Sequence, residues 1–220
     1  MYWCPDCKTQ LEKLDGKICC NPCAKSYSAQ GGFYVFDESP LVLNLDYRLD
    51  KKLLDIENNE LINKLGRYLI PRLGEVNGRR ILSVGCGGGK DIEALNNLGA
   101  EAYGMDFAYR IEQWDTEKLN PNHLFVSSSN KLPFPNDFFD IILCMGVIEH
   151  VAEQLLAEKK YNRLHIERQK FLKELLATLK PGGIVILTSP NRNFLIDFQH
   201  DAYGSMRILR RFSIYVHSPF

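Results

Sequence analysis

The sequence predicts an α/β fold built on a parallel sheet, with a small metal-binding ribbon ahead of it. Three observations carry this prediction. Apolar runs of strand length alternate with helical patterns between residues 80 and 190, which is typical of parallel β-α-β units. A glycine cluster joins the first of these runs to a helical stretch. Two C-x-x-C pairs stand near the N-terminus of this 220-residue chain, which is long enough for one ordinary domain and a small appendage.

Composition narrows the functional class. Lys and Arg together number 27, as do Asp and Glu, so no net charge attracts the chain to nucleic acid or to an anionic membrane. The longest apolar stretch, around residues 141–148, is far shorter than the roughly 20 residues of a membrane helix. The N-terminus lacks the basic-then-apolar pattern of a signal peptide. We therefore expect a cytoplasmic protein.

Cysteines cluster at the N-terminus. Cys4, Cys7, Cys20 and Cys23 form two C-x-x-C knuckles, and each knuckle can place two thiolates on one tetrahedral zinc ion. Disulfides are the alternative, but a reducing cytosol disfavours them. Cys19 could replace Cys20 in a C-x3-C spacing, although the paired knuckle is the commoner geometry and favours Cys20.

The chain is expected to divide near residue 38. Residues 1–38 form the predicted zinc ribbon and residues 39–220 the second domain, because Asp37-Glu38-Ser39-Pro40 punctuates the sequence between them. The charges of the ribbon nearly cancel, which weakens an RNA-binding role, since phosphate contacts depend on clustered Lys and Arg. A leucine stripe from Leu49 to Leu69 then predicts a helix that is ended by Pro71 and by the turn residues Asn77-Gly78.

The first β-α-β unit carries the main functional signal. Strand one is predicted at residues 80–84, followed by a cluster with glycine at 85, 87 and 89 and by a helix that begins near Asp91. Glycine lets the backbone turn at positive φ and approach a ligand closely. Strand two is predicted at residues 102–105, and Asp106 stands at its end, 21 residues after Gly85. A carboxylate at this place can accept hydrogen bonds from both hydroxyls of a ribose. The pair predicts an adenosine-type cofactor site.

Three further strands are predicted after this unit. Strand three is predicted at residues 123–127, strand four at 140–144 and strand five at 184–187. The apolar stripe that ends at Leu179 predicts a core-facing helix between the last two strands. Strand four is apolar on both faces, as a central parallel strand should be.

The glycine run has the form G-x-G-x-G, whereas a nicotinamide dinucleotide fingerprint would have its third glycine at Lys90. In this it resembles the first motif of class I S-adenosylmethionine-dependent methyltransferases, whose second-strand acid matches Asp106. Three later segments, residues 130–144, 147–151 and 179–187, resemble further motifs in the order of that family. The resemblance covers residues 80–190 and implies a Rossmann-like sheet. The ribbon is similar to one found ahead of some bacterial methyltransferases.

The resemblance also implies a set of site residues. The cofactor contacts that it implies are Gly85, Gly87, Gly89, Asp106 and Ser128. The glycines would admit the amino-acid part of S-adenosylmethionine, the carboxylate would bind its ribose, and the serine would lie near adenine. The family commonly has an Asp in place of that serine and another in place of Ser83, and a hydroxyl accepts a hydrogen bond less strongly than a carboxylate does.

The acceptor is less well defined than the cofactor. The Asn/Asp-Pro-Pro-aromatic motif of enzymes that methylate adenine or cytosine amino groups is absent after strand four, where Glu149 and His150 stand instead. These two residues and His200 are the candidates for catalysis, although His150 could equally close a helix start. We expect methyl transfer to a small molecule or to a glycan or lipid precursor. The alternatives are an RNA methyltransferase and a non-catalytic binding protein on the same fold.

Strand five raises a question of edge protection. Residues 184–187 are apolar on both faces, which is the pattern of an interior strand, yet only 31 residues follow Ser189. The resembling fold has seven strands in the order 3-2-1-4-5-7-6, and the last two need more chain than this. We therefore expect the C-terminal strands to be incomplete in a truncated chain, or the edge to be covered by the tail or by a second copy in a homodimer.

Overall fold

A computed structural model describes residues 2–36, 59, 62–63, 65–127, 131–152, 155 and 158–189. The chain divides into two compact units, Met1–Ser189 and Pro190–Phe220, and every described residue belongs to the first. Within these residues, no helix combines the length and the apolar character needed to cross a membrane.

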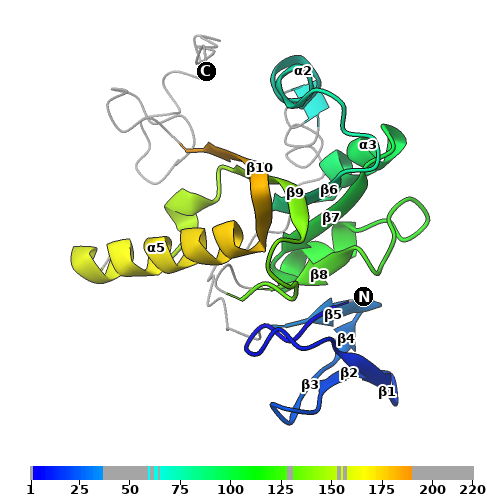
Figure 1. Ribbon diagram of the computed structural model, residues 1–220, viewed down its shortest axis with the longest axis vertical. Coiled ribbons are helices and arrows are strands. Elements are labelled where there is room, and N and C mark those ends of the chain that lie inside the picture. The colour runs from blue at the N-terminus through cyan, green and yellow to red at the C-terminus, as the bar shows by residue number, and fades with distance from the viewer. Residues whose placement is uncertain are drawn as a thin grey trace. The chain divides into compact units, whose positions relative to one another are not determined.

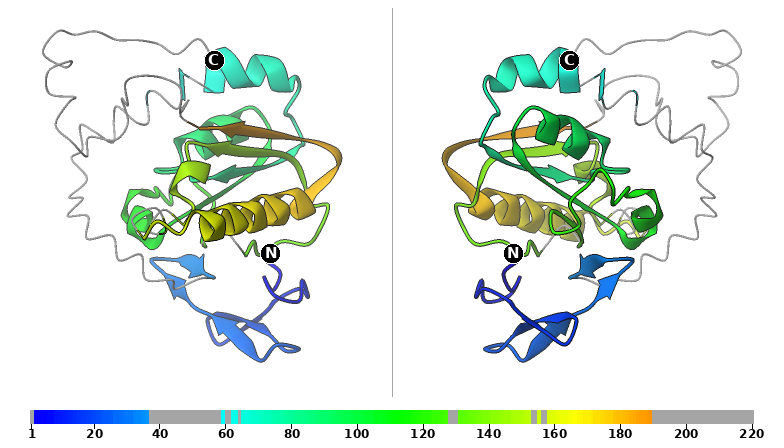
Figure 2. Two further views of the ribbon diagram at one scale, coloured as in Figure 1. Left: turned by 90° about the vertical axis from the view of Figure 1, so that its left-hand side faces the viewer. Right: turned by 90° about the vertical axis from the view of Figure 1, so that its right-hand side faces the viewer.

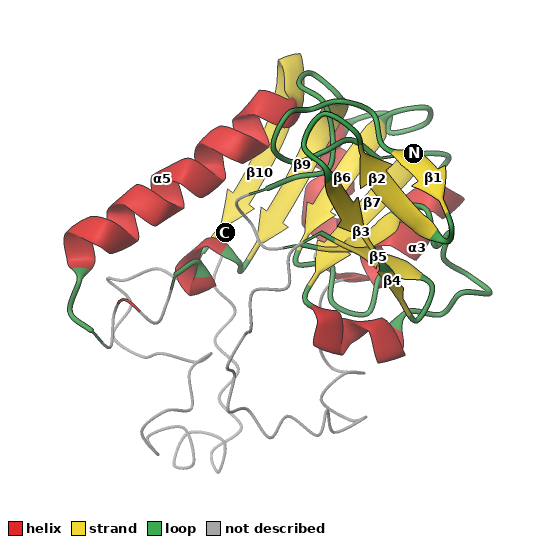
Figure 3. Cartoon of the chain, turned by 90° about the horizontal axis from the view of Figure 1, so that it is seen from below, coloured by secondary structure: helices red, strands yellow, loops and turns green. Residues whose placement is uncertain are grey.

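The unit is organised around a seven-stranded sheet with the order β10-β9-β6-β7-β8-β5-β4 (Figures 1 and 3). Neighbouring strands run parallel except β4 and β5, which form an antiparallel hairpin at one edge. In sheet order the strands are β10 (Leu179–Thr188), β9 (Phe139–Met145), β6 (Arg80–Val84), β7 (Glu101–Asp106), β8 (Leu124–Val126), β5 (Phe33–Val35) and β4 (Ala29–Gln30). The predicted α/β class and the predicted order 3-2-1-4-5 of the central strands are confirmed.

Two outer strands come from an unexpected part of the chain. Residues 33–35 fall within the predicted ribbon of residues 1–38, but as β5 they pair in parallel with β8, with Tyr34 opposite Phe125. The sheet therefore extends into the N-terminal segment. The division at residue 38 stays a prediction, since residues 37–58 lie outside the described ranges.

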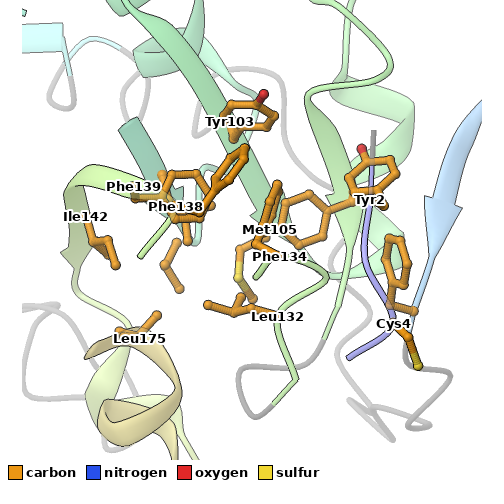
Figure 4. Close-up of a cluster of buried hydrophobic side chains, with 14 of the residues drawn as sticks. Tyr2, Cys4, Tyr103, Met105, Leu132, Phe134, Phe138, Phe139, Ile142 and Leu175 are labelled. Carbon is orange, nitrogen blue, oxygen red and sulfur yellow. The ribbon is translucent and has the colours of Figure 1, made fainter. Parts of the chain in front are cut away.

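We call residues 2–36 the ribbon. Besides β4 and β5, the ribbon holds a small antiparallel sheet of β1 (Glu12–Leu14), β2 (Lys17–Cys20) and β3 (Lys25–Tyr27). Its first residues pack against the main sheet. The hydroxyl of Tyr2 donates a hydrogen bond of 3.1 Å to the carbonyl of Leu124 in β8. Figure 4 shows Tyr2 and Cys4 in the same buried cluster as Phe134 and Leu132.

Helices cover both faces of the central strands. Alternate residues of β6 and β9 point to opposite sides, so that Leu82 and Ile142 lie in one core and Ile81 and Ile141 in the other. The first core is closed by α5 (Tyr161–Thr178) and the second by α3 (Lys90–Asn97) and α2 (Ile70–Leu73). Figure 2 shows the yellow helix α5 and the cyan helix α2 on opposite sides of the sheet.

Short helical turns complete the unit: η1 (Leu65–Leu69), η2 (Ala108–Gln113) and η3 (Ile148–His150). Pro71 does not itself end the leucine-striped helix. Helical backbone continues through η1 and α2 to Leu73, with Pro71 in the first turn of α2 and Gly74 at the C-cap. Leu65 and Leu69 are buried, as the stripe predicts, and the earlier leucines of the stripe lie outside the described residues.

The edge formed by β10 is partly open in the described unit. Ile184 and Leu187 are 38% and 43% exposed, and β10 has a neighbour on one side only among the described strands. Incomplete C-terminal strands and a homodimer through this edge both stay predictions.

Candidate cofactor and metal sites

The glycine loop, Gly85–Gly89, connects β6 to α3. Gly85 and Gly89 have φ of 72° and 75°, and a Cβ on either would lie within 3 Å of a side-chain atom, at 2.5 Å from Val147 Cγ2 and 2.8 Å from Leu119 Cδ1 respectively. Gly87 also has positive φ, but none of the described residues has an atom within 4 Å of the place where its Cβ would stand. Packing therefore explains two of the glycines, and the third keeps one side of the loop accessible to a ligand.

Asp106 ends β7 beside this loop. Its Oδ2 accepts a hydrogen bond of 2.8 Å from the backbone N–H of Gly87, and its Oδ1 accepts one of 2.7 Å from Phe107. The residue is only 9% exposed. A carboxylate offers about four acceptor positions and can therefore accept hydrogen bonds from several donors at once. Asp106, the residue predicted to bind the ribose, is thus hydrogen-bonded to the predicted glycine loop.

Trp114 was missed in the sequence analysis. It follows η2, is buried, and donates a hydrogen bond of 2.8 Å from its indole Nε1 to the carbonyl oxygen of Gly87. The Gly87 residue is consequently held at both its N–H and its C=O, by Asp106 and by Trp114. No local pattern around Trp114 signals a partner 27 residues away, and a tryptophan within a polar stretch was the only available hint.

Asp91 was noted only as a helix start, but it is a fully buried acid in the first turn of α3. It accepts hydrogen bonds from the hydroxyl of Ser83 and from the backbone N–H of Ile92. Burial raises the pKa of its carboxyl to about 6, because the charged form loses its hydration. Ser83, which departs from the resembling pattern, thus serves as a donor to Asp91 beneath the loop.

The end of β8 lies next to Asp106. Ser127 is buried, its hydroxyl donates to the carbonyl of Lys131 at 2.8 Å, and its N–H donates to the backbone carbonyl of Asp106 at 3.4 Å. Ser128, the predicted adenine contact, lies outside the described residues.

Glu149 lies in η3, just past the carboxyl end of β9. Both of its carboxylate oxygens are buried, and neither has a hydrogen-bond partner among the residues that the structure describes. A buried charge without a partner is costly, which makes this carboxylate a candidate for contact with a ligand. Burial, together with the nearby negative charge of Glu149, raises the pKa of the Cys144 thiol to about 12.

Arg168 of α5 fixes the turn that carries Glu149. Its Nη2 donates to the backbone carbonyl of Glu149 at 2.6 Å, and its Nε donates to that of Val151 at 3.4 Å. His150 is exposed, and its backbone N–H donates to Val147, while His200 lies outside the described residues.

The predicted metal ligands come together. The Sγ atoms of Cys4, Cys7, Cys20 and Cys23 all lie within 4.8 Å of one another. The Cys7–Cys20 and Cys4–Cys23 sulfur pairs are 3.4 and 3.9 Å apart, close to the roughly 3.8 Å that tetrahedral thiolates have when each Zn–S bond is 2.3 Å. Cys19 is not part of this group. Four thiols in this geometry fit a structural zinc ion.

Comparisons with known proteins agree with this arrangement. A family model described as a methyltransferase domain matches residues 54–215. The chain is 31% identical over 139 residues to a ubiquinone biosynthesis O-methyltransferase of Coxiella burnetii, covering 61% of this chain and 53% of the relative. It is also 31% identical over 120 residues to the protein of that name in Bradyrhizobium diazoefficiens, covering 53% and 42%. The chain thus spans about half the length of the curated relatives that it matches.

Among solved structures, the fold resembles a SAM dependent methyltransferase from Archaeoglobus fulgidus. The similarity covers 65% of this chain and 59% of the other, with 21% identity and a TM-score of 0.48.

Proposed function

This chain belongs to the methyltransferase-domain family, and on that premise we propose that it transfers the sulfonium methyl group of S-adenosylmethionine to a hydroxyl of a small molecule or of a glycan or lipid precursor. One observation carries the cofactor assignment. The open side of Gly87 lies beside a carboxylate, Asp106, that is hydrogen-bonded to the same glycine. Such a loop admits a ligand to the backbone and offers acceptors to ribose hydroxyls.

Methyl transfer requires little covalent participation by the protein. When bound, S-adenosylmethionine supplies an activated methyl group for an in-line displacement, in which the acceptor oxygen forms a bond to carbon as the carbon–sulfur bond breaks. Gly85, Gly87 and Gly89 would admit the amino-acid part, Asp106 would hold the ribose, and Ser128 would lie near adenine. Holding the reacting atoms in line within a dry pocket can provide most of the acceleration.

The acceptor hydroxyl must lose its proton during this transfer. Glu149 is the group that we assign to this step, because its two carboxylate oxygens are buried without a partner in the described part of the chain. Arg168 holds the turn from the backbone side and leaves the carboxylate free to face a ligand. Small-molecule acceptors are supported by the names of the curated relatives, both of which are O-methyltransferases.

We also propose that Cys4, Cys7, Cys20 and Cys23 hold one structural zinc ion. Four protein ligands would leave no open position for catalysis, so the ion would serve to fold the ribbon. Two of the four lysines in residues 2–36 are engaged within the protein: Lys8 pairs with Glu174 at 2.5 Å, and Lys25 pairs with Asp6 at 2.5 Å. Paired lysines are poorly suited to phosphate contacts, which favours a non-RNA acceptor.

Two measurements test this function. Calorimetry with S-adenosylmethionine and with NADH should show binding of the first only, and binding of NADH alone would exclude a methyltransferase. Incubation of fractionated cell extract with radiolabelled cofactor should place the methyl group in the small-molecule or lipid fraction. Label in the RNA fraction would overturn the acceptor class, and cofactor binding without label in any fraction would indicate a non-catalytic protein.

A further inference from the structure

The ribbon reaches the glycine loop through a hairpin. Phe33 of β5 is 1% exposed, and its ring packs edge-on against Trp114 with 4.8 Å between the ring centroids. Gly31, at the turn of the same hairpin, lies so close to η2 that a Cβ there would be 2.7 Å from Ile111 Cγ2. Trp114 in turn donates to the carbonyl of Gly87. A buried aromatic contact thus links the ribbon to the loop through a single intermediate residue.

A second connection approaches Gly87 from its N–H side. Asp6, between the first two cysteines, pairs with Lys131 at 2.6 Å, and the carbonyl of Lys131 accepts a hydrogen bond from Ser127. Ser127 is bonded to Asp106, which holds the N–H of Gly87. The lysine side chain is 50% exposed, so this ion pair contributes little free energy.

A better-protected clamp lies next to that ion pair. Lys8 Nζ donates to the carbonyl of Leu132 at 3.0 Å, and the N–H of Leu132 donates to Glu174 at 3.0 Å. Lys8 and Glu174 are themselves paired. Leu132 is therefore fixed at both ends of its backbone by a lysine of the ribbon and a glutamate of α5. The contacts around Leu132 do not reach the glycine loop, and the route through Asp6 and Lys131 begins with an exposed ion pair. The route through Phe33 and Trp114 consists of buried side chains and ends on the loop.

We propose that the ribbon positions the glycine loop for cofactor binding and that Trp114 is the positioning residue through which it does so. This inference rests on the proposed function, since it concerns the same cofactor site. A glycine fixed at its N–H and C=O cannot turn its backbone away from the ligand, so less ordering is required on binding. Trp114 acts through Gly87 and is assigned no contact with the cofactor.

Trp114→Phe tests the hydrogen bond. Phenylalanine keeps an aromatic ring against Phe33 and removes the N–H donor. We expect affinity for S-adenosylhomocysteine, measured by calorimetry, to fall roughly 3- to 10-fold, the range for one neutral hydrogen bond. Trp3→Phe is the matched control, because Trp3 packs on Phe138 at 5.4 Å, away from the loop, and its loss should leave the affinity unchanged. Equal affinities of wild type and Trp114→Phe would overturn the proposal.

Amide hydrogen exchange of residues 85–89 gives a readout that needs no cofactor. Exchange should be faster in Trp114→Phe than in wild type and unchanged in Trp3→Phe, with peptides of β9 as an internal reference. If wild type fails to bind S-adenosylhomocysteine, the proposed function fails, but faster loop exchange would still support the positioning role. Unchanged loop exchange in a folded Trp114→Phe protein would contradict that role whatever the affinity.

Phe33→Leu tests whether the ribbon itself takes part, and it also serves if Trp114→Phe does not fold. It leaves the indole donor in place and removes the ring that supports it. We expect faster exchange at residues 85–89 and weaker binding of S-adenosylhomocysteine, whereas Tyr34→Leu, the adjacent residue on β5 that packs on Tyr2, should change neither. Equal effects of Phe33→Leu and Tyr34→Leu would mean that the ribbon only stabilises the fold in general. Such a result would refute a specific role of the contact between Phe33 and Trp114.

Discussion

Asp106 and Gly87 are joined by a hydrogen bond of 2.8 Å between a carboxylate oxygen and a loop N–H. The residue predicted to bind the ribose therefore also holds the loop that would admit the amino-acid part of the cofactor. Both tasks depend on the same charge, so they would be lost together on substitution.

Asp106→Ala should weaken binding of S-adenosylmethionine by about 1.5–3 kcal/mol, the typical contribution of a hydrogen bond to a charged group. Titration calorimetry measures the change, and the unfolding transition checks that the fold survives. Asp115→Asn is a suitable control, since Asp115 lies on an exposed turn and pairs with Lys118. Unchanged affinity in Asp106→Ala would mean that the adenosine site lies elsewhere.

The ribbon should contain one zinc ion per chain. We expect Cys20→Ser to lose the metal and Cys19→Ser to retain it, because the Cys20 sulfur belongs to the group of four and that of Cys19 does not. Elemental analysis of freshly purified, reduced protein decides both points. The core of the ribbon is continuous with that of the sheet through Tyr2, so removal of the metal by a chelator should also lower the melting temperature. Metal retention in Cys20→Ser together with loss in Cys19→Ser would exchange the two assignments.

Local patterns predicted the parts of this fold that depend on local chemistry. The positions of the central strands follow from apolar runs and from the turn residues between them, whereas their order was implied by the resemblance to the methyltransferase family. β5 could not be placed in this way. It is three residues long, and its pairing with β8 depends on contacts among Tyr2, Phe36 and Phe125, which lie far apart in sequence.

The same limit applies to the candidate site. Gly87 and Asp106 were found because their spacing is characteristic, whereas Trp114 and Arg168 bond to backbone carbonyls 27 and 19 residues away. Every residue has a backbone carbonyl, so the sequence does not indicate which carbonyl a side chain will bond to. Side chains that hold the main chain of a site are for this reason the residues that sequence reasoning misses.

Asp91 should make stability depend on pH in mildly acidic solution. Its carboxyl has a folded-state pKa near 6, above the ordinary value of 3.8, so the folded state binds its proton more tightly than the unfolded state does. The associated stability is fully present below about pH 4 and is lost as the pH rises through 6, a decrease of about 3 kcal/mol. Urea unfolding of wild type and Asp91→Asn at pH 4 and pH 7 measures this. The wild type should lose about that much more stability than the variant between the two pH values, and parallel curves would refute the assignment.

Arg168→Met should disturb the turn that carries Glu149 without touching the cofactor loop. The variant removes two hydrogen bonds to backbone carbonyls but keeps much of the apolar stem of the side chain. We expect kcat to fall several-fold while affinity for S-adenosylmethionine stays within about twofold of wild type, since a displaced base weakens catalysis by geometry. Arg163→Met, on the first turn of the same helix, is the control. A loss of cofactor affinity equal to the loss of kcat would argue for a general structural role.

Glu149→Gln tests the acceptor side directly. The two carboxylate oxygens are buried without a partner in the described residues, so an ionised Glu149 is expensive to the fold unless a ligand uses it. Glutamine keeps the shape and cannot take the proton of the acceptor hydroxyl, so kcat should fall by about 100-fold or more. Removing an unpaired buried charge should at the same time leave the melting temperature unchanged or raise it, and affinity for S-adenosylmethionine should not change. Loss of activity with retained or increased stability separates a catalytic carboxylate from a structural one.

Glu167→Gln, which removes a carboxylate paired with Lys170 on α5, should leave kcat, the melting temperature and the affinity for S-adenosylmethionine close to wild type. Full activity in Glu149→Gln would exclude Glu149 as the base, and His150→Gln would then be the next variant to assay.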